Sequence, residues 1–177
     1  MPKTKTKYNI QMAGEFLTAG ELFRKGFFAS VSFGNAKSFD IVARSPIKTD
    51  KFAYIEVKSS DNGYFTRRST PIYIDDHKFL INIITTKKEI DEAKPNFSKF
   101  YVFVALNGKQ DKADFYLFSA DRIFQVVKKK MGAIPPEKKI SGPWNINLSD
   151  IFETKEHEIS YCKENDYGWI ELRDYLR

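Results

Sequence analysis

The sequence predicts a single α/β domain in which a mixed β-sheet is flanked by helices. Three observations lead to this prediction. Residues 11–25 carry apolar side chains at helical spacing, three short segments before residue 61 are rich in strand-forming residues, and residues 101–106 form a continuous apolar run typical of a buried central strand. At 177 residues the chain is long enough for one well-buried core. We expect that core at about 10–132 and an extension at about 133–177, within the precision of pattern reading.

The first predicted helix carries an acid within its apolar face. With about 100° per residue, Glu15 falls inside the apolar arc and Glu21 on the opposite side; the arc consists of Met12, Phe16, Ala19, Leu22 and Phe23. An acid in such a position should have a cation or a metal as its partner, because burying a lone charge is costly. The alternative is a glutamate at the edge of the arc or near the helix start, where the helix dipole favours it. Gly26 suits the C-cap of this helix.

Two of the strand-like segments carry charged residues in their interiors. Asp40 interrupts residues 38–43, and Glu56 and Lys58 interrupt residues 54–60. Charge is disfavoured inside a strand, so these positions need a reason. Side chains alternate along a strand, so Glu56 and Lys58 share one face, and pairing of the two segments would bring Asp40 beside them. Two carboxylates beside an ammonium suit a divalent cation. The alternative is a surface ion-pair network.

The middle of the chain is expected to complete and cover the sheet. A helix is predicted over residues 75–88, although residues 79–84 are equally strand-like because they are rich in β-branched side chains. Residues 115–118 are expected to pair back onto the apolar central strand. A further helix is expected to begin at Ser119 or Asp121.

The extension is expected to add an edge strand and a terminal helix. Ile140, Trp144 and Ile146 have the spacing of one side of a strand, and residues 171–177 suit a helix. Its aromatic side chains are more often used to cover a core or a dimer contact than to stack on bases.

The charge balance favours a polyanionic partner. The chain has 29 Lys and Arg against 23 Asp and Glu, a formal net charge of +6, and phosphate contacts supply most sequence-independent affinity for nucleic acid. Arg67 and Arg68 lie in a loop-like segment just after Lys58, where they are expected to meet a nucleic-acid backbone. An ordinary solvated loop and an ordinary lysine-rich surface are the alternatives.

Other classes of protein find little support. No apolar stretch is long enough to span a bilayer, and the first residues lack the apolar core of a secretory signal, so a cytoplasmic protein is expected. Cys162 is the single cysteine, and His77 and His157 stand outside any zinc-hydrolase motif. The sequence has no P-loop and no dinucleotide-binding glycine pattern, so no nucleotide cofactor is expected.

An acid on one strand followed by Glu-x-Lys on the next resembles the active site of the PD-(D/E)xK nuclease superfamily. The matching residues are Asp40 and the triplet Glu56-Val57-Lys58, and the resemblance covers roughly residues 11–60. Phe39 stands where the nominal motif has proline. The resemblance implies a restriction-endonuclease-like fold, a three-layer core with a mixed central sheet flanked by helices.

The resemblance also implies a Mg²⁺-dependent DNA endonuclease, with Mn²⁺ expected to substitute. In such an enzyme Asp40 and Glu56 hold the ion together with the Val57 carbonyl. Lys58 positions a water or helps to deprotonate it, and offsets charge in the transition state. Glu15 binds a second ion, holds a water or steadies Lys58.

The expected partners follow from the same resemblance. Ser60, on the strand face of Lys58, is expected beside the site and, with Arg67 and Arg68, at the nucleic acid. A two-fold homodimer would place one site on each DNA strand. The competing interpretation is a non-catalytic nucleic-acid-binding or protein-interaction module on the same fold.

Overall fold

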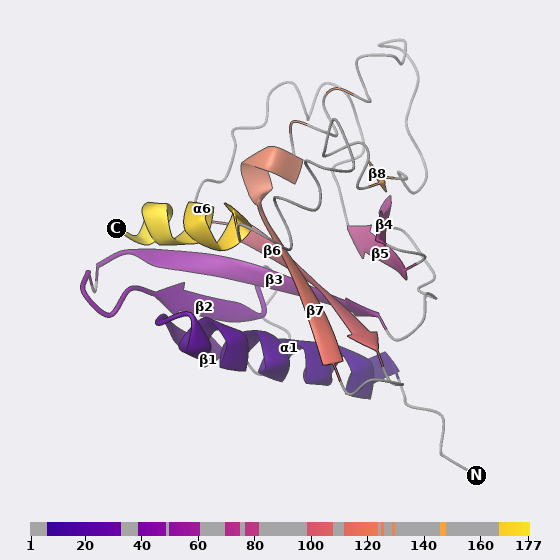
Figure 1. Ribbon diagram of the computed structural model, residues 1–177, viewed down its shortest axis with the longest axis horizontal. Coiled ribbons are helices and arrows are strands. Elements are labelled where there is room, and N and C mark those ends of the chain that lie inside the picture. Colours follow the sequence, from indigo (N-terminus) through magenta and orange to yellow (C-terminus); the bar gives the residue numbers. More distant parts are fainter. Residues whose placement is uncertain are drawn as a thin grey trace.

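The computed structural model describes the first half of the chain most fully (Figure 1). The described residues are 7–32, 39–48, 50–60, 70–74, 77–81, 99–107, 112–123, 125, 129, 146–147 and 167–177. The elements in chain order are α1 (Lys7–Arg24), β1 (Phe28–Val31), β2 (Ile41–Arg44), β3 (Phe52–Ser60), β4 (Thr70–Ile74), β5 (His77–Ile81), β6 (Lys99–Asn107), β7 (Lys112–Ser119), β8 (Ile146–Asn147) and α6 (Tyr167–Leu176).

The central sheet has five strands and is mixed, which confirms the predicted α/β class. Its order is β1-β2-β3-β6-β7. The pair β3 and β6 is parallel, and the other neighbours are antiparallel. A second sheet of three strands has the order β5-β4-β8. The charged strand β3 therefore lies in the middle of the larger sheet, between β2 and β6.

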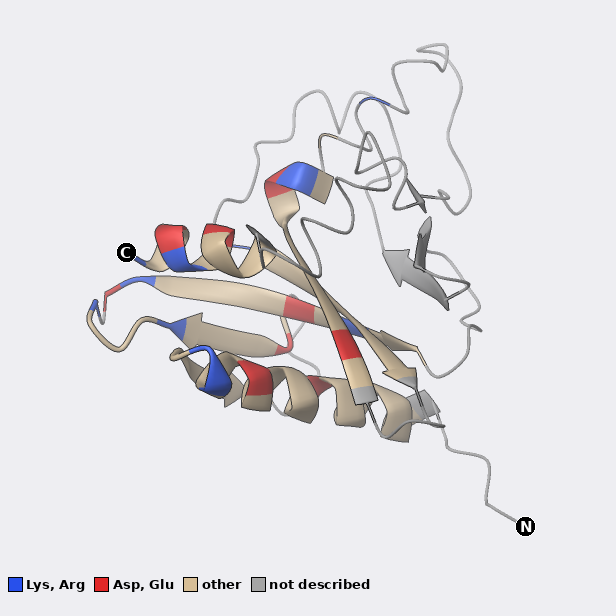
Figure 2. Cartoon of the chain, in the orientation of Figure 1, with Lys and Arg blue, Asp and Glu red and all other residues tan. Residues whose placement is uncertain are grey.

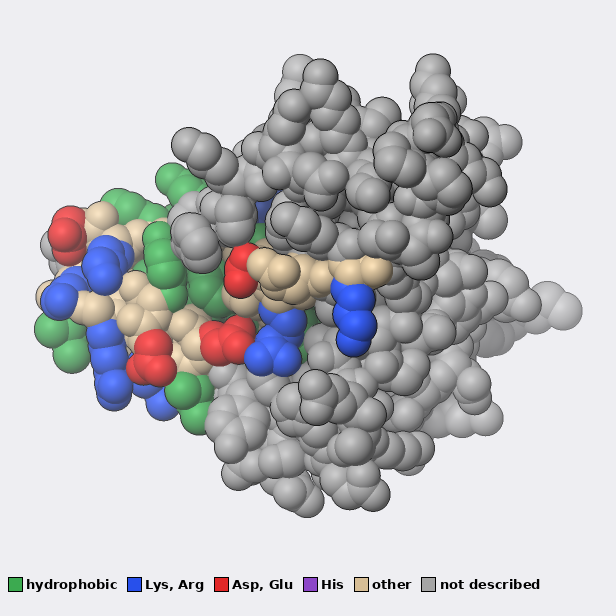
Figure 3. Space-filling view, turned by 90° about the horizontal axis from the view of Figure 1, so that it is seen from above, with side chains coloured by type: hydrophobic (Ala, Val, Ile, Leu, Met, Phe, Trp, Pro, Cys, Tyr) green, Lys and Arg blue, Asp and Glu red, His purple; other side chains and the backbone are tan. Residues whose placement is uncertain are grey.

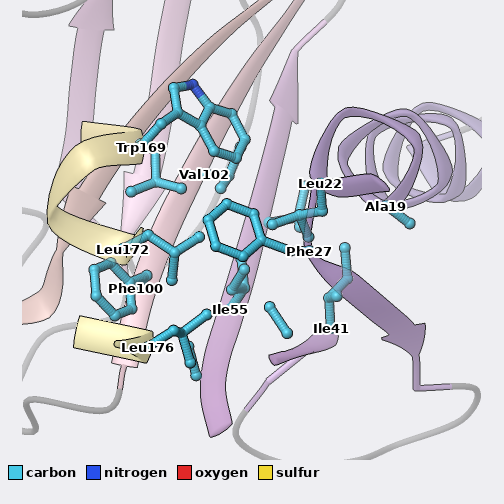
Figure 4. Close-up of a cluster of buried hydrophobic side chains, with 14 of the residues drawn as sticks. Ala19, Leu22, Phe27, Ile41, Ile55, Phe100, Val102, Trp169, Leu172 and Leu176 are labelled. Atoms are coloured by element: carbon cyan, nitrogen blue, oxygen red, sulfur yellow. The ribbon is translucent and has the colours of Figure 1, made fainter. Parts of the chain in front are cut away.

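Helices α1 and α6 pack against one face of the larger sheet. Every second residue of β3 from Ala53 to Val57 is buried, and these positions join side chains from both helices in one apolar cluster (Figure 4). The cluster includes Leu22, Ile55, Val102, Trp169 and Leu172. A helical layer on the second face, which the three-layer fold requires, stays a prediction. In the part of the chain that the structure describes, no helix is long and apolar enough to cross a membrane.

Helix α1 ends at a glycine that the sequence had indicated as its C-cap. The Gly26 N–H donates to the Phe23 carbonyl at 3.0 Å, and the Phe27 N–H donates to the Leu22 carbonyl at 2.9 Å. This pair of bonds is a Schellman motif, which needs the left-handed conformation that Gly26 adopts with φ of 87°. Phe27 and Leu22 are both in the apolar cluster, so the cap also fixes the direction in which the chain enters β1.

The buried face of α1 differs from the predicted apolar arc. Phe16 and Phe23 were placed in that arc, but they are 52% and 54% exposed. Ala19 and Leu22 of that arc are buried as expected, and Glu15 and Thr18 are buried beside them. The prediction that Glu15 lies on the buried side is therefore confirmed. The buried face of α1 is rotated relative to the predicted arc, so that it includes Thr18 and leaves Phe16 and Phe23 exposed.

Later elements agree with the sequence in part. The helix predicted over residues 75–88 is wrong at residues 77–81, which form β5 and pair antiparallel with β4; residues 75, 76 and 82–88 lie outside the described residues. The helix after β7 begins as expected: residues 120–123 are helical, and Ser119 Oγ accepts the Arg122 N–H at 3.3 Å as an N-cap. Ile146 lies in β8, while Ile140 and Trp144 of the predicted edge strand lie outside the described residues. Helix α6 begins at Tyr167, four residues earlier than expected.

Candidate active site

Asp40 is fixed by both its backbone and its carboxylate at the point where β2 begins. Its N–H donates to the Ile55 carbonyl, and its carbonyl accepts from the Ser32 N–H, each at 2.8 Å. Its Oδ2 accepts the Val57 N–H at 2.7 Å. The carboxylate thus takes the place of a backbone carbonyl in the ladder beside β3. This bond brings Asp40 next to the residues on either side of Val57.

Glu56 and Lys58 lie on the face of β3 that points away from the apolar cluster. Lys58 Nζ is 2.7 Å from Glu56 Oε1. Lys99, at the start of β6, approaches from the neighbouring parallel strand, and its Nζ is 2.6 Å from Glu56 Oε2. Each oxygen of Glu56 is therefore paired with a different ammonium. The ammonium of Lys99 also lies 5.1 Å from the centre of the Tyr101 ring, a favourable cation–π arrangement.

Glu15 approaches the same region from α1. It is 4% exposed, and Gln11 Nε2 donates to its Oε1 at 3.1 Å. The charges of Asp40 and Lys58 both act on it. Acidic residues of α1, of β3 and of the coil before β2 are coloured together in Figure 2. Glu15 therefore lies within electrostatic range of Asp40 and Lys58, and the hydrogen bond to the Val57 N–H brings Asp40 beside Glu56 and Lys58.

A close approach of helix to strand determines where Glu15 lies. At Gly14, an added Cβ would overlap Ser59 Oγ and would lie 2.6 Å from Ser59 Cβ. The absence of a side chain at Gly14 therefore lets α1 pack directly on β3. Because Glu15 is the next residue, this contact sets its distance from the strand that carries Glu56 and Lys58.

The three carboxylates respond differently to their surroundings. Burial raises the pKa of Glu15 above its ordinary value, and the Gln11 hydrogen bond only partly opposes this. Burial also raises the pKa of Asp40, against the Val57 hydrogen bond and the charge of Lys58. Burial acts in the same direction on Glu56, but Lys58 and Lys99 outweigh it and lower the pKa of Glu56 overall. Nearby positive charge therefore outweighs the effect of burial on the pKa of Glu56, but not on the pKa of Glu15 or Asp40.

The site offers carboxylate and carbonyl oxygens, which are the atoms that a hard divalent cation binds. These oxygens do not converge on a single point. Among the described residues, no group of three or more His, Cys, Asp or Glu side chains is arranged to hold a metal ion. Carboxylate and carbonyl oxygens are nonetheless the ligands that Mg²⁺ prefers. Because burial raises the pKa of Glu15 and of Asp40, additional positive charge beside either carboxylate would stabilise its charged form.

Of the three residues predicted to contact nucleic acid, the structure describes only Ser60. Ser60 lies on β3, but it is fully buried, which contradicts a direct contact with nucleic acid. Arg67 and Arg68 lie outside the described residues. On the surface in Figure 3, acidic and basic side chains lie next to one another in the described part.

Lys99 is the site residue that sequence analysis missed. It belongs to this face because the parallel register places Lys99 opposite Tyr54 and Tyr101 opposite Glu56. A period of two was visible in the sequence, since Lys99, Tyr101 and Phe103 fall on one side of a strand. Its pairing with β3 was not visible. Burial lowers the pKa of Lys99, but its contacts with Glu56 and Tyr101 outweigh this and raise it.

Comparisons with known proteins do not identify a family for this chain. No protein-family model matches the chain, and no curated protein matches it. Among solved structures, a bacterial homing endonuclease is similar with a TM-score of 0.37 and 13% sequence identity. The match covers 69% of this chain and 70% of that one. This likeness is too weak to transfer an activity.

Proposed function

We propose that the chain is a Mg²⁺-dependent DNA endonuclease of the PD-(D/E)xK type, with the three-layer restriction-endonuclease-like arrangement around its mixed sheet. The observation that carries this proposal is the hydrogen bond of 2.7 Å from the Val57 N–H to Asp40 Oδ2. It holds an acid of one strand beside the Glu-x-Lys of the next. The net charge of +6 supports a polyanionic substrate.

Asp40, Glu56 and the Val57 carbonyl would hold the ion, with Glu15 as a further acid. When bound, Mg²⁺ supplies a Lewis acid for the scissile phosphate and makes a coordinated water more acidic. Glu15 and Asp40 favour such an ion, because their burial leaves negative charge insufficiently compensated. Mn²⁺ is expected to substitute, since it accepts the same oxygen ligands.

Lys58 would provide positive charge where the transition state gains negative charge. Its ammonium already lies within the site, 2.7 Å from Glu56 Oε1. A charge that is held in place before reaction stabilises the transition state without the cost of reorganising solvent. Lys58 would also hold the attacking water in line with the phosphorus.

Lys99 and a divalent cation would compete for Glu56. Lys99→Met removes one of the two ammonium groups on this carboxylate, so the concentration of Mg²⁺ that gives half-maximal DNA nicking is expected to fall about threefold, as for a partly solvated ion pair. Lys99→Arg keeps the charge and should leave that concentration nearly unchanged. A Lys99→Met enzyme with the wild-type metal dependence would show that Lys99 does not limit access to Glu56.

The proposal is tested by cleavage of supercoiled, linear and branched DNA with Mg²⁺ or Mn²⁺, against EDTA. The wild-type protein should nick or cut at least one of these forms, and EDTA should stop it. Glu56→Gln has almost the same shape but no negative charge, and it should abolish cleavage. Asp174→Asn is the matched control, because Asp174 is exposed on α6, and it should cut at the wild-type rate.

The other outcomes assign the chain differently. DNA binding without cleavage in any metal would favour a non-catalytic binding module, which the paired lysines on Glu56 also allow. Neither binding nor cleavage would make Asp40, Glu56 and Lys58 a structural ion-pair network. Cleavage that survives Glu56→Gln would remove this site from the reaction.

A further inference from the structure

The face of the sheet that carries Glu56 continues into a surface of exposed aromatic rings. In the register of β1, β2 and β3, Phe28 lies opposite Arg44, and Arg44 lies opposite Phe52. Tyr54 lies on β3 between Phe52 and Glu56. The exposed fractions are 46% for Phe28, 41% for Phe52 and 36% for Tyr54. We call Phe28, Phe52 and Tyr54, together with Arg44, the aromatic face.

Cations are placed among these rings. The Arg44 guanidinium carbon lies 5.0 Å from the centre of the Phe28 ring. On the side of β3 that is away from β2, Lys99 of β6 lies opposite Tyr54. Phe39, next to Asp40, packs against Tyr54 with ring centres 4.9 Å apart and planes tilted by 42°. The rings and their cations therefore lead directly to the acids of the candidate active site.

This combination fits a nucleic acid with unpaired bases. Flat rings bind bases by stacking, and cations between them bind phosphates. In a duplex each base is already stacked between its neighbours, so its faces are closed to a protein ring. Arg44 among the rings and Lys99 on the adjoining strand β6 favour a polyanion over an apolar protein segment.

We propose that the aromatic face binds unpaired nucleotides beside the site of cleavage, so that the substrate is DNA with a single-stranded segment next to the scissile bond. This inference rests on the proposed nuclease function for the position of the cut. The binding itself needs only the aromatic face. Tyr54 is two residues from Glu56 on the same strand face, a separation of about 7 Å, so a base stacked on Tyr54 belongs to a nucleotide at or next to that bond.

The test measures binding to labelled oligonucleotides in EDTA by fluorescence anisotropy, so that no cleavage is required. The probes are single-stranded oligothymidine and a blunt duplex of the same length. The double variant Phe52→Ala/Tyr54→Ala should lose about tenfold in affinity for the single strand, the loss typical of base stacking. Its affinity for the duplex should change less than twofold.

Two further variants guard against general effects of the substitutions. Phe23→Ala removes a ring that is 54% exposed on α1, away from the aromatic face, and should bind both probes as the wild type does. Phe52→Leu/Tyr54→Leu keeps apolar side chains over the strand and should still lose single-strand affinity, because leucine has no flat ring. Thermal unfolding should show that all variants are folded.

The outcomes separate this inference from the proposed function. Metal-dependent cleavage by a protein whose aromatic-face variants bind both probes normally would overturn the inference and leave the function standing, and the face would then fit a protein partner. Selective loss of single-strand binding in a protein that never cuts would support the aromatic face and refute the nuclease. An equal loss on single strand and duplex would overturn stacking as the mode of contact.

Discussion

Replacing Lys58 by methionine will lower the rate of DNA cleavage at saturating substrate by about 100-fold to 1,000-fold, the usual effect of removing one preorganised group that stabilises transition-state charge. The fold should be kept, because the Lys58 side chain is 31% exposed and methionine retains most of its apolar stem. Glu56 should remain charged, since Lys99 still pairs with its second oxygen. Single-turnover cleavage with excess enzyme measures this step.

The matched control is Lys48→Met, which removes an exposed lysine from the turn between β2 and β3. That variant has the same change in net charge, so it should cleave at the wild-type rate once DNA is saturating. DNA affinity in EDTA should be nearly equal for the two variants. A Lys58→Met enzyme with wild-type single-turnover kinetics would remove this lysine from the mechanism.

Gly168→Ala will destabilise the protein by about 3 kcal/mol or more, which is the upper range for overpacking a core. A Cβ at this position would overlap the Leu117 carbonyl oxygen and lie 2.9 Å from the carbonyl carbon. Leu117 is held in place on β7 by its pairing with Val102 of β6. Helix α6 would therefore have to move away, and Trp169 and Leu172 would leave the apolar cluster.

Gly20→Ala is the matched control for this prediction. Nothing lies within 4 Å of a Cβ added at Gly20, which is exposed within α1. Alanine is favoured over glycine inside a helix, so this variant should be more stable by about 0.5–1 kcal/mol. Thermal and urea unfolding compare the two variants. Equal stabilities for both would mean that α6 does not pack on β7 as closely as described.

The elements that the sequence predicted well are those with local signals. Gly26 closes α1 because a Schellman motif needs a glycine at that point, and Ser119 caps the helix after β7 because its hydroxyl reaches an N–H three residues on. The charged positions of β3 were informative for a similar reason. Charge is rare inside a strand, so Glu56 and Lys58 marked one face before any pairing was known.

The elements that the sequence predicted poorly depend on partners that are distant along the chain. An apolar run such as residues 79–84 suits a helix or a strand, and the part of it that the structure describes, residues 79–81, lies in β5 because it pairs with β4. Lys99 joined the site through the parallel pairing of β6 with β3, in which it lies opposite Tyr54, 45 residues earlier in the chain. On α1, Phe16 was expected to be buried, but the contact of Gly14 with Ser59 turns Glu15 and Thr18 toward the sheet and leaves Phe16 exposed.

The hydrogen bond from the Val57 N–H to Asp40 also makes the geometry of the candidate active site depend on the register of β2 and β3. It forms only when β2 and β3 are in register, because the carboxylate has to stand at one position of the ladder. A slip of β2 by one residue would turn its side chains to the opposite face of the sheet and move Asp40 away from Glu56. Under the proposed function, the chain would gain nuclease activity only when β2 and β3 are correctly aligned. Misfolded copies would be inactive without the need for any inhibitor.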